Sequence, residues 1–89
     1  MSKRATIIDE DAEHVRAAYW RRRIMLLRVE QLSELIGYSW REVYQKESGT
    51  GQDGQPIAGP VWLRYKLACA AVHARKHGWD RGKEFEWKL

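Results

Sequence analysis

Five residues between positions 40 and 46 carry side chains that can donate hydrogen bonds, hold positive charge or present a ring: Trp40, Arg41, Tyr44, Gln45 and Lys46. The fork of Arg41 can donate to O6 and N7 of guanine, and Gln45, one helical turn later, can pair with adenine. Tyr44 and Lys46 are suited to phosphate contacts. This is the chemistry of nucleic-acid recognition, although such a run is also typical of a solvated helix surface.

Two short helices joined by a turn are predicted to position these side chains. Apolar residues recur at helical spacing up to Ile36 and predict a helix over residues 29–36. Gly37 tolerates the positive φ that ends a helix. Ser39 and Glu42 form the pattern of a capping box, so the second helix should run from Trp40 to Ser48, with Val43 pointing inward. A helix-turn-helix unit of this kind can place its second helix in a DNA groove.

Residues 12–49 resemble the XRE family, the helix-turn-helix domain of phage repressors and Cro proteins. Without any gap, the positions that carry the resemblance are Arg22, Leu27, Leu32, Gly37, Ser39, Val43, Glu47 and Gly49. The chain departs from the family at Val29, where a glutamine usually helps to hold a phosphate, and at Lys46, where an apolar residue usually packs inward. The overall layout also resembles regulators encoded beside anti-CRISPR genes.

The resemblance implies a compact all-α domain of four to five helices that binds double-stranded DNA. It also implies specific roles: an ion pair between Arg22 and Glu47, a base contact by Trp40 near a thymine methyl group, and phosphate contacts by Arg21, Arg23 and Arg28. For these three arginines, the alternative is an ordinary surface position that aids solubility.

The segments on either side of this unit are also predicted. A first helix is expected from about Asp9 to Leu26, with its inner face formed by Ala12, Val15, Tyr19, Leu26 and the stem of Arg22. Glycine and proline recur over residues 50–60 and predict a loop. Pro60 and Gly78 bracket a long helix over residues 61–77.

That long helix has two apolar faces. One comprises Val61, Tyr65, Ala68, Cys69 and Val72, and the opposite one comprises Leu63, Leu67, Ala70, Ala71 and Ala74. A monomer of this size needs only one apolar face, so the second predicts a symmetric homodimer. The alternative is that the C-terminal tail covers this face within one chain.

The C-terminal tail alternates apolar and charged residues. Phe85, Trp87 and Leu89 alternate with Glu86 and Lys88, the period of a half-buried strand. Such a segment can pair between two chains or dock on its own domain.

The chain of 89 residues is expected to form one domain, divided into a DNA-binding core (9–49), a loop (50–60) and a dimerisation helix with its tail (61–89). A formal charge of +4 favours polyanionic partners. Since no signal peptide or membrane span is evident and Cys69 is the single cysteine, we expect the cytoplasm of a bacterial or phage-infected cell.

The residue types do not favour catalysis. No nucleophile with a base, paired carboxylates or phosphate-binding loop can be assembled, so we expect no enzyme and no cofactor. Cys69, His73 and His77 share one helix edge, but a closed zinc site needs four ligands, so we expect no metal. The sequence predicts a transcriptional repressor of phage or mobile-element type that binds an inverted-repeat operator as a homodimer. The alternative is a protein-binding module, such as an antitoxin or phage-encoded inhibitor with the same fold.

Overall fold

Four α-helices and one π-helical turn form the computed structural model, which describes residues 12–51, 54–77 and 85–89. The elements are α1 (Glu13–Tyr19), the π-helical turn η1 (Trp20–Ile24), α2 (Val29–Ile36), α3 (Trp40–Ser48) and α4 (Gly59–His77). The predicted all-α class with a long C-terminal helix is therefore confirmed, and α2 and α3 have the predicted bounds. Within the described ranges, no helix is long and apolar enough to cross a membrane.

The first helical segment is not the regular helix that was predicted over residues 9–26, of which residues 9–11 lie outside the described ranges. The N–H of Met25 donates to the Trp20 carbonyl (2.9 Å), and the N–H of Leu27 donates to the Arg21 carbonyl (3.0 Å). The first of these bonds spans five residues, so η1 accommodates one residue more than an α-turn. Leu26, at φ 56°, ends the turn in the left-handed region.

The predicted inner face of this segment is therefore wrong except at Tyr19, which is partly buried against the core. The residues that the segment buries are Arg16, Ala17, Trp20, Arg21 and Met25, whereas Val15, Arg22 and Leu26 are exposed. The inner face is formed by Ala17 with Trp20 and Arg21, which are three and four residues further along the chain. The predicted face, which included Arg22 and Leu26, lies elsewhere on the segment.

The core lies where these elements meet α4. Trp20, Leu32, Val43, Tyr65 and Cys69 come from η1, α2, α3 and α4, and each is almost completely buried. Tyr65 and Cys69 were predicted on the inner face of α4, whereas Val61, at the start of that predicted face, is 41 % exposed. The core thus joins all three later helices to the end of the first.

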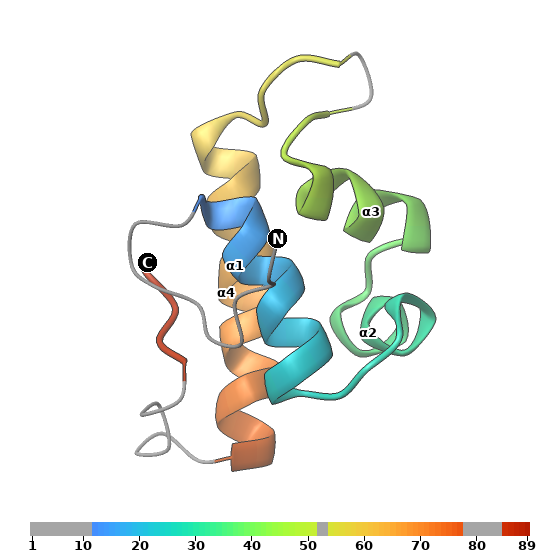
Figure 1. Cartoon of the computed structure of the whole chain (residues 1–89), viewed down its shortest axis with the longest axis vertical. Helices are drawn as coiled ribbons and strands as arrows, with labels where there is room; N and C mark the ends of the chain where they lie inside the picture. Colours follow the sequence, from blue (N-terminus) through green and yellow to red (C-terminus); the bar gives the residue numbers. More distant parts are fainter. Residues whose placement is uncertain (1–11, 52–53, 78–84) are drawn as a thin grey trace, which may run out of the picture.

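Side-chain bonds hold the first helical segment to α4. The indole N–H of Trp20 donates to His73 Nδ1 (3.1 Å) in the buried interior. Glu13 accepts from Trp62 Nε1 (2.5 Å) and pairs with Lys66 (2.6 Å). In Figure 1, α1 passes in front of α4, while α2 and α3 lie together on one side of them.

The tail docks on its own chain, on the side of α1 and α4 away from α2 and α3 (Figure 1). Arg16 donates to the Glu86 carbonyl (2.7 Å) and lies 4.8 Å from the Phe85 ring centre. Trp87 packs edge-on against Trp20, at 5.0 Å between ring centres. Residues 85–89 form no strand, so the prediction of a strand is wrong, and the tail instead contacts α1, η1 and α4.

Candidate nucleic-acid interface

The turn between α2 and α3 forms as the sequence predicts. Helix α2 ends at Gly37, which has φ 75°, and the Gly37 N–H donates to the Ser33 carbonyl (3.0 Å). Ser39 caps α3: the Glu42 N–H donates to Ser39 Oγ (3.1 Å) and the Ser39 N–H donates to Glu42 Oε1 (2.9 Å). The bond from the Ser39 backbone lowers the pKa of Glu42, since it stabilises the carboxylate. The start of α3 is therefore fixed by local bonds alone.

One side of α3 is held against the rest of the molecule. Val43 is fully buried and Lys46 is 5 % exposed, while the Glu47 side chain is 7 % exposed. Lys46 and Glu47 are three and four residues after Val43, so all three lie on one side of the helix. The opposite face of α3 is left at the surface.

Arg41 and Gln45, two of the residues predicted to contact bases, lie on that outer face, and Trp40 lies at its edge, three residues before Val43. Trp40 is 50 % exposed, Arg41 is exposed and Gln45 is partly exposed. The rings of Trp40 and Tyr44 meet edge-on at 5.7 Å, and the Arg41 guanidinium carbon lies 5.4 Å from the Trp40 ring centre. The start of α3 thus presents a cation and two rings to the surface, held against one another before any partner binds.

The predicted ion pair between Arg22 and Glu47 is wrong by one residue. Arg21 forms the pair instead: its Nε donates to Glu47 Oε2 (2.6 Å) and its Nη2 donates to Oε1 (2.9 Å). A third donor, Nη1, binds the Leu27 carbonyl (2.8 Å). The bonds to Glu47 raise the pKa of Arg21. Because Arg21 is buried and each of its three guanidinium nitrogens bonds within the chain, its predicted role in phosphate contact is also wrong.

Lys46 is likewise misplaced among the predicted phosphate contacts. Its ammonium nitrogen lies 5.5 Å from the Tyr38 ring centre and 5.6 Å from the Tyr65 ring centre, with the residue buried between α3 and α4. Ring faces attract a cation, and the long apolar stem packs as an aliphatic side chain would. Lys46 therefore occupies the inward position at which the XRE pattern has an apolar residue.

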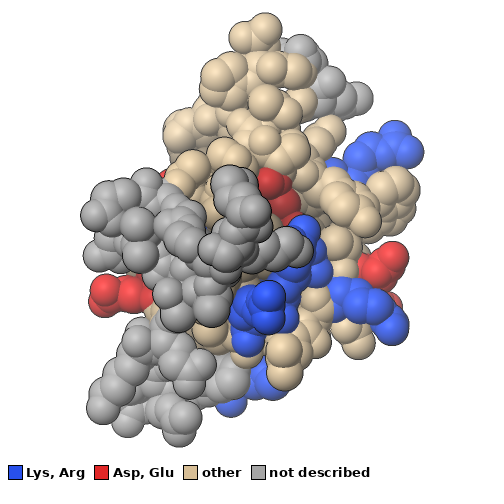
Figure 2. Space-filling view, viewed as in Figure 1, with Lys and Arg blue, Asp and Glu red and all other residues tan. Residues whose placement is uncertain are grey.

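The remaining predicted phosphate contacts are accessible. Arg23 and Arg28 are exposed, and Tyr44 is 53 % exposed. Arg28 precedes α2, where its backbone N–H donates to Gln31 Oε1 (2.8 Å) and leaves its side chain at the surface. In Figure 2 the visible Lys and Arg side chains lie mostly on the half of the molecule that carries α2 and α3. Positive charge of this kind suits a polyanion.

The second apolar face of α4 lies opposite the core. Leu63 and Leu67 are 41 % and 48 % exposed, Ala71 is exposed, and Ala70 and Ala74 are partly exposed. The docked tail contacts Arg16, Trp20 and Lys66 and leaves both leucines at the surface. Residues 85–89 of the tail thus leave the face predicted for dimerisation uncovered.

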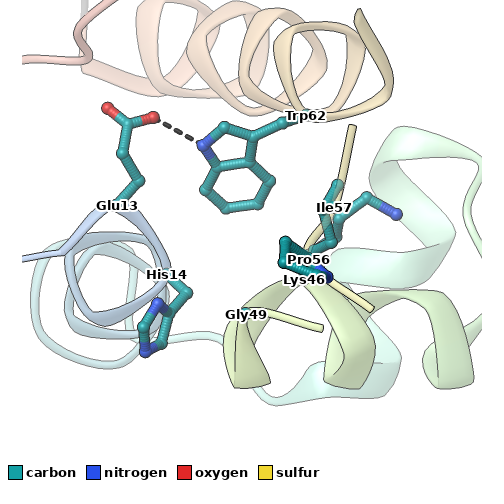
Figure 3. A pocket seen from close by; sticks show the side chains of 7 residues that line it. All are labelled: Glu13, His14, Lys46, Gly49, Pro56, Ile57 and Trp62. Atoms are coloured by element: carbon teal, nitrogen blue, oxygen red, sulfur yellow. Dashed lines mark hydrogen bonds between the residues drawn. The ribbon is translucent and has the colours of Figure 1, made fainter. Parts of the chain in front are cut away.

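A small cavity of about 160 Å³ lies beside the end of α3 (Figure 3). Trp62 and Ile57 form apolar walls, and His14 stands next to Gly49. Burial alone would raise the pKa of Glu13, but its bonds from Lys66 and Trp62 outweigh burial and lower it. This carboxylate therefore has a structural role in joining α1 to α4.

No metal cluster forms among the residues that the structure describes. Cys69 is fully buried and His73 is bonded to Trp20, so two of the three residues on that helix edge have structural roles. Sequence reasoning missed the role of Arg21, and three consecutive arginines offer no signal to choose among them. The chain matches no family model, no curated protein and no solved structure.

Proposed function

We propose that this protein is a sequence-specific DNA-binding transcriptional regulator, a repressor of phage or mobile-element type, that binds an inverted-repeat operator as a homodimer. The observation that supports this proposal best is the division of α3 into two faces. Val43, Lys46 and Glu47 pack against the rest of the molecule. Trp40, Arg41 and Tyr44, which follow the hydrogen-bonded turn between α2 and α3, remain at the surface. A helix presented in this way can enter the major groove.

In the proposed complex, Arg41 reads guanine, Gln45 contacts adenine and Trp40 lies against a thymine methyl group. Arg23, Arg28 and Tyr44 hold phosphates and set the position of the helix. The packing of Arg41 on Trp40 limits the rotamers of its long side chain before binding. Less side-chain entropy is then lost when the guanidinium meets a base.

Selection of bound sequences from a random duplex pool tests this proposal, and a palindromic consensus is the expected result. Arg41→Ala should weaken binding to the selected site by about 10- to 100-fold, which corresponds to about 1–3 kcal/mol. Its effect on random duplex should be small. Arg64→Ala is the matched control, because Arg64 is an exposed arginine on α4. No enrichment, or equal losses from both variants, would count against base reading by α3.

The proposed dimer uses the exposed stripe of α4. Leu67→Glu should convert the dimer to a monomer in sedimentation and weaken operator binding, because it places a charge in the middle of an apolar contact. Val15→Glu introduces the same charge at a residue of similar exposure on α1 and should leave the dimer intact. A wild-type chain that remains monomeric at high micromolar concentration would contradict the dimer.

A protein-binding module is the second candidate, favoured by the exposure of Trp40 and Tyr44. Large rings at a surface are frequent anchors of protein interfaces. Salt separates the two functions: binding to DNA that weakens steeply with rising salt supports phosphate contacts. Failure to bind any duplex at low salt would favour the module.

A further inference from the structure

A cavity of about 380 Å³ lies where the link after η1, helix α2 and the last turns of α4 meet, at the end of the molecule opposite the α3–α4 loop (Figure 1). Four apolar side chains line it: Met25, Leu27, Leu35 and Val72. Its volume falls in the range of about 300–1,000 Å³ that is usual for small-molecule sites, which are also mainly apolar with a few polar groups.

Two basic residues of α4, Arg75 and Lys76, complete the lining. The Lys76 ammonium lies 3.5 Å from the Met25 carbonyl oxygen, a weak contact that uses one of its three donors. Neither residue forms a salt bridge with a carboxylate in the described ranges of the chain. Two positive charges therefore stand beside an apolar cavity with capacity to bind an anion.

From this combination we propose that the cavity binds a small amphipathic anion, whose apolar body lies against Leu27, Leu35 and Val72 and whose anionic end lies between Arg75 and Lys76. A wholly polar ligand would leave apolar walls without contacts, and a cation would be repelled by both basic residues. The apolar body can be an alkyl chain or an aromatic ring. This site is separate from α3, and the proposal does not depend on DNA binding.

Titration of the full chain, followed by amide signals in two-dimensional NMR, tests the proposal with three probes below their micelle concentrations. Decanoate has an alkyl chain and a carboxylate, 2-naphthoate has a ring and a carboxylate, and decyltrimethylammonium has the same chain length with a positive end. Either carboxylate should shift the signals of Leu27, Leu35 and Val72 to saturation, and the ammonium probe should not. Decanoate alone would indicate a chain-shaped body, and 2-naphthoate alone would indicate a ring.

The double variant Arg75→Gln/Lys76→Gln should bind the effective carboxylate at least tenfold more weakly. Arg22→Gln/Arg64→Gln is its control, because it removes the same charge from two other exposed residues and should leave the affinity unchanged. All four positions are exposed, so both variants should keep the circular dichroism spectrum of the wild type. Three results would overturn the proposal: no carboxylate binding at millimolar concentration, equal binding of the ammonium probe, or equal losses in the two double variants.

Discussion

Glu47→Ala is expected to lower the free energy of unfolding by about 3–5 kcal/mol, because it leaves a buried guanidinium without its carboxylate. The side chains of Arg21 and Glu47 are 8 % and 7 % exposed, so water has little access to replace the two lost bonds. The bond from Arg21 to the Leu27 carbonyl remains and holds the guanidinium in place. A change of about 1 kcal/mol shifts the melting temperature of a domain this size by about 4–8 °C. The melting temperature of Glu47→Ala should therefore fall by at least about 12 °C.

Urea unfolding followed by circular dichroism measures this loss, and the neighbouring arginines supply matched variants. Arg21→Ala should be strongly destabilising, whereas Arg22→Ala should change the unfolding free energy by less than about 0.5 kcal/mol because Arg22 is exposed. Arg21→Met/Glu47→Ala should be less destabilised than Glu47→Ala alone, because no unpaired charge stays buried. Equal losses from Arg21→Ala and Arg22→Ala, or an unchanged midpoint in Glu47→Ala, would refute this reasoning.

Three further predictions concern stability and reactivity. Gly49→Ala should lower the free energy of unfolding by about 1 kcal/mol or more beyond the decrease caused by Gly37→Ala, although both glycines have positive φ. Thermal unfolding measures this difference. An added Cβ on Gly49 would lie 2.8 Å from His14 Nδ1, whereas nothing lies within 4 Å of an added Cβ at Gly37. His14→Ala should therefore restore part of the stability that Gly49→Ala loses. Equal decreases in stability from the two glycine variants would exclude the clash. Cys69, whose pKa burial raises to about 12, should resist iodoacetamide at pH 8 in the native state and react after unfolding, as mass spectrometry will detect; rapid native labelling would contradict its burial. The lowered pKa of Glu42 means that its carboxylate stabilises the fold above its ordinary value of 4.5 and that this stabilisation is lost as the pH falls through the lower folded value. The destabilisation caused by Glu42→Ala should therefore shrink between pH 7 and pH 3, and a constant difference would exclude the cap as its cause.

Local chemistry explains why α2 and α3 could be predicted from the sequence. Gly37 marks the end of one helix and Ser39 with Glu42 marks the start of the next, and each signal acts within four residues of the chain. The exposure of Arg41 also follows locally, because Val43, two residues later, fixes which side of α3 faces inward. Such features need no knowledge of distant partners.

The rest of the site depends on contacts that residue types do not reveal. The ion pair was assigned to Arg22 because the resemblance to the XRE pattern placed it there without a gap, whereas the contact that selects Arg21 among three consecutive arginines comes from Glu47 on α3, 26 residues away. Lys46 was assigned to the surface by its charge, but Tyr65, one of the two rings that hold it, comes from α4, across the α3–α4 loop. The pairing of Trp20 with His73 likewise spans 53 residues.

The contacts of the first helical segment with the tail also limit how two copies of the chain could associate. Arg16 and Trp20 hold the tail through a 2.7 Å hydrogen bond and an edge-on ring contact. Exchange of tails between chains would require these contacts to be broken and remade. The leucines at 63 and 67 are already exposed and need no such rearrangement. Association through α4 itself is therefore the route that we propose, and it is the route that Leu67→Glu tests.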